Sequence, residues 1–387
     1  MDLSFSPEEE AFAQEVRAWL AANLELPPRF ESLDDEIEWG RAWQAKLATG
    51  RWVGIHWPAE YGGRGASPVQ VAIFNMEYAR SRALQPVNRV GINLAGPTLL
   101  AHGTEEQKQR WLPPILDASE LWCQLFSEPG AGSDLASLRT RAERGEGGWL
   151  LSGQKVWTSY ARQARWGICL ARTDPDAPRH RGISYLVVDM RAPGIDVRPL
   201  VQITGEAEFN EVFLDEVFVP DDHLVGELDQ GWAVANTTLA HERGTSFPFK
   251  EQVVHEVYLD ELYALAEERR VLDDPAASDA LAQAFVELRV LRLHNWRTLS
   301  RLARGVDPGP ESSWVKLAWT AMTQHLSDTA LDVVDAPAPL WADASDNPAD
   351  GKWQRQWLWS KAASIAGGTS EIQRTIIGER ILGLPRG

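Results

Sequence analysis

The residues best suited to chemistry form a glycine-rich segment, QLFSEPGAGSD, at positions 124–134. Gly130 and Gly132 flank an alanine, so backbone N–H groups can approach an anion closely, and Ser133 adds a hydroxyl. Taken alone, the segment also fits an ordinary turn. It is not the dinucleotide-binding fingerprint of a parallel α/β fold, because the third glycine and the βαβ context are missing.

Two further segments supply complementary chemistry. Trp157, Thr158 and Ser159 end a predicted strand about 25 residues after the glycine-rich segment. An indole face can cover an aromatic ring and a hydroxyl can bond a ring nitrogen, although Trp157 alone also fits a strand-end core residue. Gly367 and Gly368 form a tight turn before a helix N-terminus, where backbone amides can hold an oxyanion or phosphate.

Five motifs, in this order along the chain, resemble those of the acyl-CoA dehydrogenase family. The resemblance covers essentially the whole chain, and the third motif matches almost residue for residue. The motifs are WPAEYGGRG (57–65), HGTEEQK (102–108), FSEPGAGSD (126–134), NEVF through Val219–Pro220 and on to Gly231–Trp232 (210–232), and GTSEIQR (368–374).

The resemblance implies FAD bound between a β domain and C-terminal helices, and oxidation of an acyl-CoA to the trans-2-enoyl-CoA. Electrons would pass to an electron-transfer flavoprotein. The implied cofactor contacts are Gln124, Phe126 and Ser127 beside the isoalloxazine, Gly132 and Ser133 near the pyrophosphate or the CoA moiety, Trp157 stacked on the ring, Thr158 and Ser159 at its polar edge around N5, and Thr369 and Glu371 on the C-terminal side.

The resemblance also directs the search for a catalytic base. Most of the family has a glutamate directly before the Gly-Thr of the last motif, but this chain has Gly367 there, and glycine cannot take a proton. A minority branch, resembling isovaleryl- and long-chain-type enzymes, uses the glutamate of a Glu-Arg pair after the β domain. That pair is Glu242 and Arg243 here. A carboxylate buried against acyl chain and flavin has a raised pKa, which suits a general base.

Glu242 is therefore the candidate base, and Arg243 is a structural or substrate-side charge. Gly367 would offer its backbone N–H to the thioester carbonyl, and Ser133 would also face the substrate. Two alternatives stay open. His241 is a second candidate base, and Glu242 would otherwise be a solvated helix residue that pairs with a neighbour. A base after the β domain favours a branched, bulky or long acyl group.

Two features of the family are missing from this chain. The Arg-x-x-Phe-Gly motif that reaches the FAD of a neighbouring subunit is absent from residues 265–275, and the later glycine-rich turn is unrecognisable at 335–347. Either other residues substitute in a homo-oligomer, a dimer or tetramer, or a related subunit supplies the contacts in a hetero-oligomer. Gly367 keeps open an assembly subunit without turnover, although Glu242 argues against it. Oxidase or desulfinase chemistry on the same fold is a further alternative.

Local patterns predict an α+β fold with three domains. Residues 1–121 form an N-terminal helical domain, residues 122–229 a central antiparallel β-barrel or sandwich, and residues 230–387 a C-terminal four-helix bundle. Runs of β-branched and aromatic residues predict the strands at 149–159, 166–172, 183–189 and 211–219.

Helix starts and stops support the two helical segments. Ser6, Ser67 and Thr104 each stand at an N-cap position, and Ser6 and Ser67 are each followed by a proline. Isoleucines at 372, 376, 377 and 381 form one stripe of a last helix that ends before Gly383.

Composition narrows the class of protein. The 387 residues suffice for two or three packed units. Lys and Arg number 38 against 55 Asp and Glu, and a net charge of −17 argues against nucleic-acid binding. The two cysteines show neither metal-ligand nor disulfide spacing. We expect a cytoplasmic protein without a membrane span, because the start lacks a secretory pattern and no long apolar run occurs.

Overall fold

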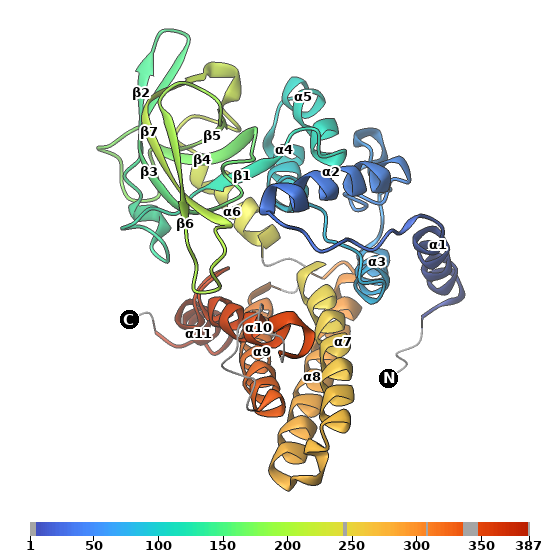
Figure 1. Cartoon of the computed structure of the whole chain (residues 1–387). Helices are drawn as coiled ribbons and strands as arrows, with labels where there is room; N and C mark the ends of the chain where they lie inside the picture. Colours follow the sequence, from blue (N-terminus) through green and yellow to red (C-terminus); the bar gives the residue numbers. More distant parts are fainter. Residues whose placement is uncertain (1–4, 243–245, 307–308, 336–346, 386–387) are drawn as a thin grey trace. The chain divides into compact units, whose positions relative to one another are not determined.

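The computed structural model describes residues 5–242, 246–306, 309–335 and 347–385 (Figure 1). The chain packs as two compact units. The sheet unit comprises Leu26–Ala66 and Leu84–Glu242, and the helical unit comprises Met1–Glu25, Ser67–Ala83 and Arg243–Gly387. The helices that precede the first strand are thus divided between the two units.

The sheet unit is built on one seven-stranded sheet, with strand order β1-β4-β2-β3-β7-β6 and with β5 paired to β4. Its core includes Leu125, Leu151, Leu186 and Val212, each with no exposed surface. The strands are β1 (Trp122–Leu125), β2 (Arg141–Gly145), β3 (Gly148–Ser159), β4 (Trp166–Arg172), β5 (Ile183–Asp189), β6 (Ile195–Leu200) and β7 (Phe209–Pro220).

The four strands expected from the sequence are present as β3, β4, β5 and β7. Three strands were not anticipated, and each has a weak local pattern. β1 has only four residues, β2 is rich in charge, and β6 is largely exposed, with Asp196 and Arg198 along it. The pairing also differs from the antiparallel expectation, because β1 and β2 each pair with β4 in parallel.

Helices of the sheet unit pack beside these strands. They are α2 (Leu33–Thr49), α4 (Gly96–His102), α5 (Glu105–Leu116) and α6 (Gly231–Glu242), with a π-helical turn at Gly91–Ala95 leading into α4. Thr104 and Gln107 form the capping box that starts α5, as expected from the sequence.

The motif WPAEYGGRG surrounds a completely buried indole. Trp57 has no exposed surface. A Cβ at Gly63 would come 2.1 Å from the backbone oxygen of Trp57, and a Cβ at Gly96 would come 2.1 Å from its ring. These glycines therefore allow chain and helix to approach the indole.

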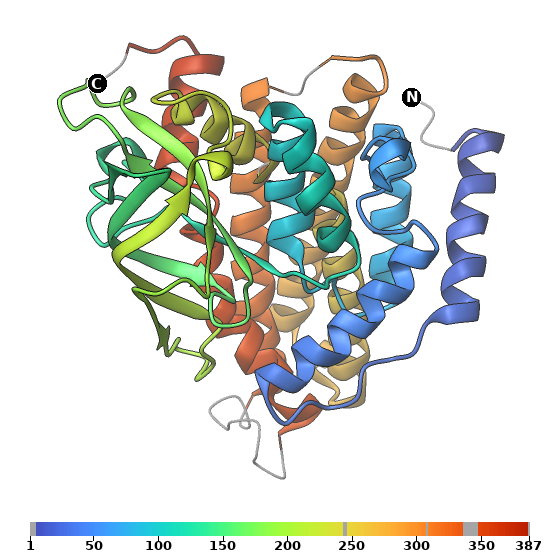
Figure 2. The same cartoon turned by 90° about the horizontal axis from the view of Figure 1, so that it is seen from above.

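The helical unit holds the long helices α7, α8 and α9 side by side (Figures 1 and 2). Ser6 and Ser67 cap α1 and α3 with capping boxes, as predicted. Leu262, Leu288, Trp319, Leu326 and Trp353 belong to the apolar core. The helices are α1 (Pro7–Asn23), α3 (Pro68–Arg80), α7 (Ser246–Glu268), α8 (Pro275–Leu302), α9 (Ser312–Val334), α10 (Lys352–Ser360) and α11 (Ser370–Ile376).

The predicted α+β class is confirmed, with helices before and after a central β segment. The last isoleucine stripe does not form one regular helix, because α11 continues into a π-helical turn at Ile377–Ile381. Of positions 335–347, where the family's later glycine-rich turn is unrecognisable in the sequence, residues 336–346 lie outside the described part of the chain.

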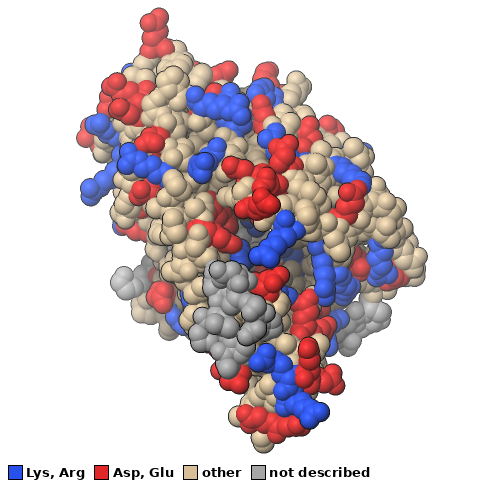
Figure 3. All heavy atoms as spheres, viewed as in Figure 1, with Lys and Arg blue, Asp and Glu red and all other residues tan. Residues whose placement is uncertain are grey.

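Charges of both signs are interspersed over the described residues on the face drawn in Figure 3. Each described helix is too short or too polar to cross a membrane.

Candidate functional site

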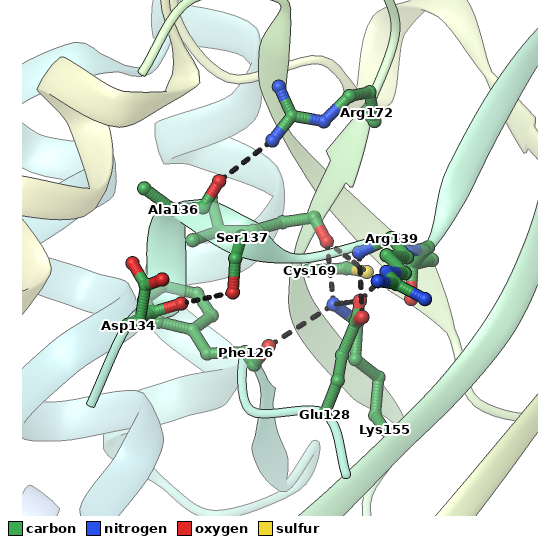
Figure 4. A network of polar contacts seen from close by, with 11 residues as sticks. Phe126, Glu128, Asp134, Ala136, Ser137, Arg139, Lys155, Cys169 and Arg172 are labelled. Atoms are coloured by element: carbon green, nitrogen blue, oxygen red, sulfur yellow. Dashed lines mark hydrogen bonds and ion pairs between the residues drawn. The ribbon is translucent and has the colours of Figure 1, made fainter. Parts of the chain in front are cut away.

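The glycine-rich segment is anchored by a buried ion pair. Lys155 of β3 has no exposed surface and Glu128 is 9% exposed. The Lys155 Nζ lies 2.9 Å from Glu128 Oε1 and also donates to the carbonyl oxygens of Phe126 (3.2 Å) and Leu170 (2.8 Å) (Figure 4). The ammonium group therefore has three acceptors, so the buried charge is compensated.

Backbone donors complete the environment of the carboxylate. The N–H groups of Arg139 and Thr140 donate to the two Glu128 oxygens at 2.7 and 2.8 Å. Burial alone would raise the pKa of Glu128, but Lys155 and these hydrogen bonds outweigh it, so that the pKa lies below its ordinary value. Glu128 is therefore a charged structural anchor at neutral pH.

The turn that follows leaves its backbone open. Glu128 and Ala131 exchange two backbone hydrogen bonds of 3.0 Å. Gly130 and Gly132 are exposed, and a Cβ at either position would meet nothing within 4 Å. Ser133 is exposed as well. This geometry leaves room for a ligand to approach the peptide groups of the turn.

A cavity of about 360 Å³ adjoins the same turn within the sheet unit. Its lining consists of Glu128, Pro129, Gly130, Ser137, Arg139, Thr140, Gly153 and Gln154.

The structure brings residues 157–159 next to the glycine-rich segment. The N–H of Val156 donates to the carbonyl of Ser127 at 2.9 Å, directly before Trp157. Phe126 is buried and its ring meets that of Tyr185 edge-on, with the ring centres 5.9 Å apart. Gln124 is half-buried in β1.

The strand turns its tryptophan outward at an irregularity. The pairing of β3 with β7 shifts register between Lys155 and Thr158, and Trp157 has a φ of +59°. The indole is 64% exposed, and its ring meets Phe209 edge-on at 6.2 Å. The indole therefore presents a large apolar face to the outside from a left-handed backbone conformation, which is sparsely populated for a residue with a bulky side chain.

The two hydroxyl residues after Trp157 differ in their surroundings. Thr158 is 1% exposed, and its Oγ1 has no hydrogen-bond partner among the described residues. Ser159 is half-buried. The bulge between Lys155 and Thr158 interrupts the alternation of side chains along β3, and Ser159 is the last residue of the strand beyond it. The exposed indole, the nearby Ser159 hydroxyl and the open glycine turn fit a planar heteroaromatic cofactor with a phosphate tail.

The candidate base lies at the end of α6. Glu242 is the last residue of that helix, but its side chain and the whole of Arg243 lie outside the described part of the chain. Desolvation lowers the pKa of His241, the alternative base. Desolvation also lowers the pKa of His56 to about 4, and His241 nearby adds to that effect. Both imidazoles are therefore neutral at pH 7.

The C-terminal candidates belong to the helical unit. Gly367 and Gly368 have φ values of +65° and +92°, and both carbonyls accept from Gln373 Nε2, at 3.1 and 3.2 Å. Thr369 caps α11, with its Oγ1 accepting from the N–H of Ile372. Glu371 is exposed and pairs with Arg374 at 3.3 Å. The expected tight turn before a helix is thus present.

Sequence reasoning missed the Glu128–Lys155 pair. A signal was available, because β3 alternates between its two faces and positions 151 and 155 share the buried one. A lysine at a buried position of a strand requires a partner, and the glutamate of EPGAGSD lies nearby in the fold.

Comparison with protein families matches nearly the whole chain. Residues 6–119, 123–217 and 229–382 match the models of the N-terminal, middle and C-terminal domains of acyl-CoA dehydrogenases.

Individual relatives are similar over the full length. Acyl-CoA dehydrogenase IpdE1 of Mycobacterium tuberculosis is 43% identical over 386 residues, covering 97% of this chain and 98% of IpdE1. The Tcur3481–Tcur3483 steroid ACAD has a TM-score of 0.88 and 28% identity, and the match covers 100% of both chains. A chain of the ChsE4–ChsE5 complex from Mycobacterium tuberculosis has a TM-score of 0.84 and 30% identity, and the match covers 100% of this chain and 100% of that chain.

Proposed function

Because the chain belongs to the acyl-CoA dehydrogenase family, and is thus an oxidoreductase whose family implies a flavin, we propose that it oxidises an acyl-CoA with FAD. The reaction would give the trans-2-enoyl-CoA. The observation that carries the proposal is the 64% exposed indole of Trp157, which directly follows the residue bonded to Ser127 of the glycine-rich segment, whose turn at Gly130 and Gly132 is open. Such a pairing suits a ring joined to a pyrophosphate.

In the proposed mechanism, Glu242 removes a proton from the α-carbon while the β-carbon loses a hydride, and the electron pair left on the α-carbon forms the double bond. When bound, the flavin supplies the acceptor for that hydride. Trp157 would cover one face of the ring and keep water from it. Ser159 would donate to the polar edge around N5, with Thr158 as its neighbour. Gly132 and Ser133 would contact the pyrophosphate or CoA.

The resemblance assigns further contacts to residues of the last motif and to the residue after Glu242. Thr369 and Glu371 would contact the cofactor, and the backbone N–H of Gly367 would polarise the thioester carbonyl. Arg243 would carry a charge beside the substrate. With Gly367 where a base is common, position 242 is the proton acceptor that the sequence offers.

The similar proteins suggest which substrates and partners to test first. One of them is a steroid ACAD and another is a complex of two ChsE chains. We therefore expect a bulky, polycyclic acyl group, a related second subunit that completes the FAD site, and an electron-transfer flavoprotein as acceptor. The absent Phe-Gly at 265–275 supports the second subunit.

The test is an absorption spectrum of the purified protein, followed by anaerobic titration with acyl-CoA esters. The panel contains steroid side-chain, long straight-chain and short branched esters, with and without a co-expressed related subunit. Bleaching of the flavin band by one class supports the proposal. A protein that stays colourless with every partner would favour the assembly-subunit alternative, and rapid peroxide formation in air would indicate an oxidase.

Replacing Trp157 with alanine provides a narrower test of the ring site. Because the indole is mostly exposed, we expect the free energy of unfolding of the flavin-free protein to change by less than about 0.5 kcal/mol. FAD affinity should fall about 5-fold, since an aromatic contact contributes on the order of 1 kcal/mol. Fluorescence titration with FAD measures this. Phe218→Ala, at another exposed aromatic of the sheet unit, is the matched control, and equal losses would remove Trp157 from the site.

A further inference from the structure

Buried hydroxyl groups from three elements form a hydrogen-bonded chain through Thr238 of α6. Thr238 has no exposed surface. Its Oγ1 lies 2.8 Å from Thr98 Oγ1 on α4 and 3.2 Å from Tyr185 Oη on β5. Thr98 Oγ1 in turn donates to the carbonyl of Leu94, at 2.8 Å, in the π-helical turn before α4. Three elements of the sheet unit therefore join at one side chain.

The direction of these hydrogen bonds follows from counting protons. Each hydroxyl has one proton to donate. Thr98 donates its hydroxyl proton to the Leu94 carbonyl, so its oxygen must accept a hydrogen bond from Thr238. Thr238 must in turn accept a hydrogen bond from Tyr185. Burial raises the pKa of Tyr185, so the phenol keeps its proton throughout the neutral range. Removing one hydroxyl from this chain leaves a buried neighbour without its partner.

Two further contacts hold α6 along its length. Gly231, the first residue of the helix, lies so close to β5 that a Cβ would come 2.4 Å from the backbone carbon of Ser184. Thr237 Oγ1 lies 2.7 Å from His102 Nε2 at the end of α4. The helix start is thus fixed by close packing, and its last turns are fixed by hydroxyl groups.

The network stands one helical turn before the candidate base. Thr238 and position 242 are four residues apart, so they lie on the same face of α6. Tyr185, whose hydroxyl contacts Thr238 on this face, also packs its ring edge-on against Phe126 of the glycine-rich segment. Thr238 thus connects the helix that carries the base to the segment expected beside the flavin.

We propose that Thr238, with Thr98 and Tyr185, positions the base at 242 by fixing the last turns of α6, an inference that rests on the proposed function. These residues act through the helix and touch neither substrate nor cofactor. A small shift of a catalytic group slows catalysis steeply, because reaction requires the reacting atoms to be close and aligned. The loss should fall on kcat, since the helix is needed to orient the base and not to bind CoA.

The experiment compares Thr238→Val, which removes the hydroxyl, with Thr238→Ser, which keeps it. Amide hydrogen exchange of peptides from α6 and the anaerobic rate of flavin reduction are measured for both. We expect exchange near position 238 to accelerate at least about 10-fold in Thr238→Val, reduction to slow about 10- to 100-fold, and the KM to change less than about 3-fold. Thr238→Ser should recover most of both effects.

The matched control is Thr329→Val in α9, where a buried hydroxyl donates to the carbonyl of His325 at 3.0 Å. It should leave both α6 exchange and turnover unchanged. Normal exchange or normal turnover in Thr238→Val overturns the positioning role. Glu242→Gln, measured in parallel, separates the two ideas. If Glu242→Gln is inactive and Thr238→Val is normal, only this inference fails. If Glu242→Gln is fully active, Glu242 is not the base, and the proposal that Thr238 positions it is rejected as well.

Discussion

Replacing Glu242 with glutamine should slow reduction of the bound flavin by an acyl-CoA about 100- to 10,000-fold, because a positioned general base contributes that much to a rate. Glutamine has nearly the shape of glutamate but cannot take the α-proton. The yellow flavin should remain bound, since the proposed cofactor contacts come from other residues. Anaerobic stopped-flow mixing measures the rate, and the absorption spectrum measures flavin content.

Two companion variants make this result specific. Glu38→Gln changes an exposed glutamate of α2 and should leave the rate unchanged. His241→Asn tests the alternative base, because the lowered pKa of His241 leaves its imidazole neutral and able to accept a proton at pH 7. If Glu242→Gln turns over normally and His241→Asn does not, the base is His241.

The helix caps and the strands could be predicted because they depend on neighbouring residues. Ser6, Ser67 and Thr104 cap the helices expected of them. The strand predicted at 183–189 is β5 to the residue, since β-branched and aromatic residues make up most of it. Local sequence is sufficient where a pattern repeats over one element.

The residues that hold the candidate site together could not be predicted in the same way. Thr98 and Thr238 are 140 positions apart, and a threonine in a helix carries no sign of a distant partner. Glu128 and Lys155 are 27 positions apart, and they meet only because the turn folds back over β3. Family resemblance supplied candidates for cofactor contact, while the interactions that support those residues required the fold.

Lys155→Met should lower the free energy of unfolding by about 3–5 kcal/mol, the typical cost of removing one partner of a buried ion pair. Methionine fills much of the same volume, but Glu128 would then be a buried charge without its cation. Urea denaturation at pH 7 measures the change. Adding Glu128→Gln should recover part of the loss, because the two residues are in contact. Arg198→Met, which breaks the exposed pair with Asp196, should cost less than about 1 kcal/mol.

The pH dependence of the stability of Lys155→Met tests whether loss of the charge pair causes the destabilisation. The pKa of Glu128 in the folded protein is below its ordinary value of 4.5, so its contribution to stability is present above pH 4.5 and is lost as the pH falls towards the folded value. Without Lys155, burial should instead raise this pKa, and protonation should relieve the uncompensated charge. The stability difference between wild type and Lys155→Met should therefore begin to narrow above pH 4.5, as the pH falls through the raised pKa of Glu128 in the variant, and should narrow further below pH 4.5, where wild type loses its own Glu128 contribution. A difference that stays constant down to pH 3 would mean that lost packing, and not lost charge pairing, causes the destabilisation.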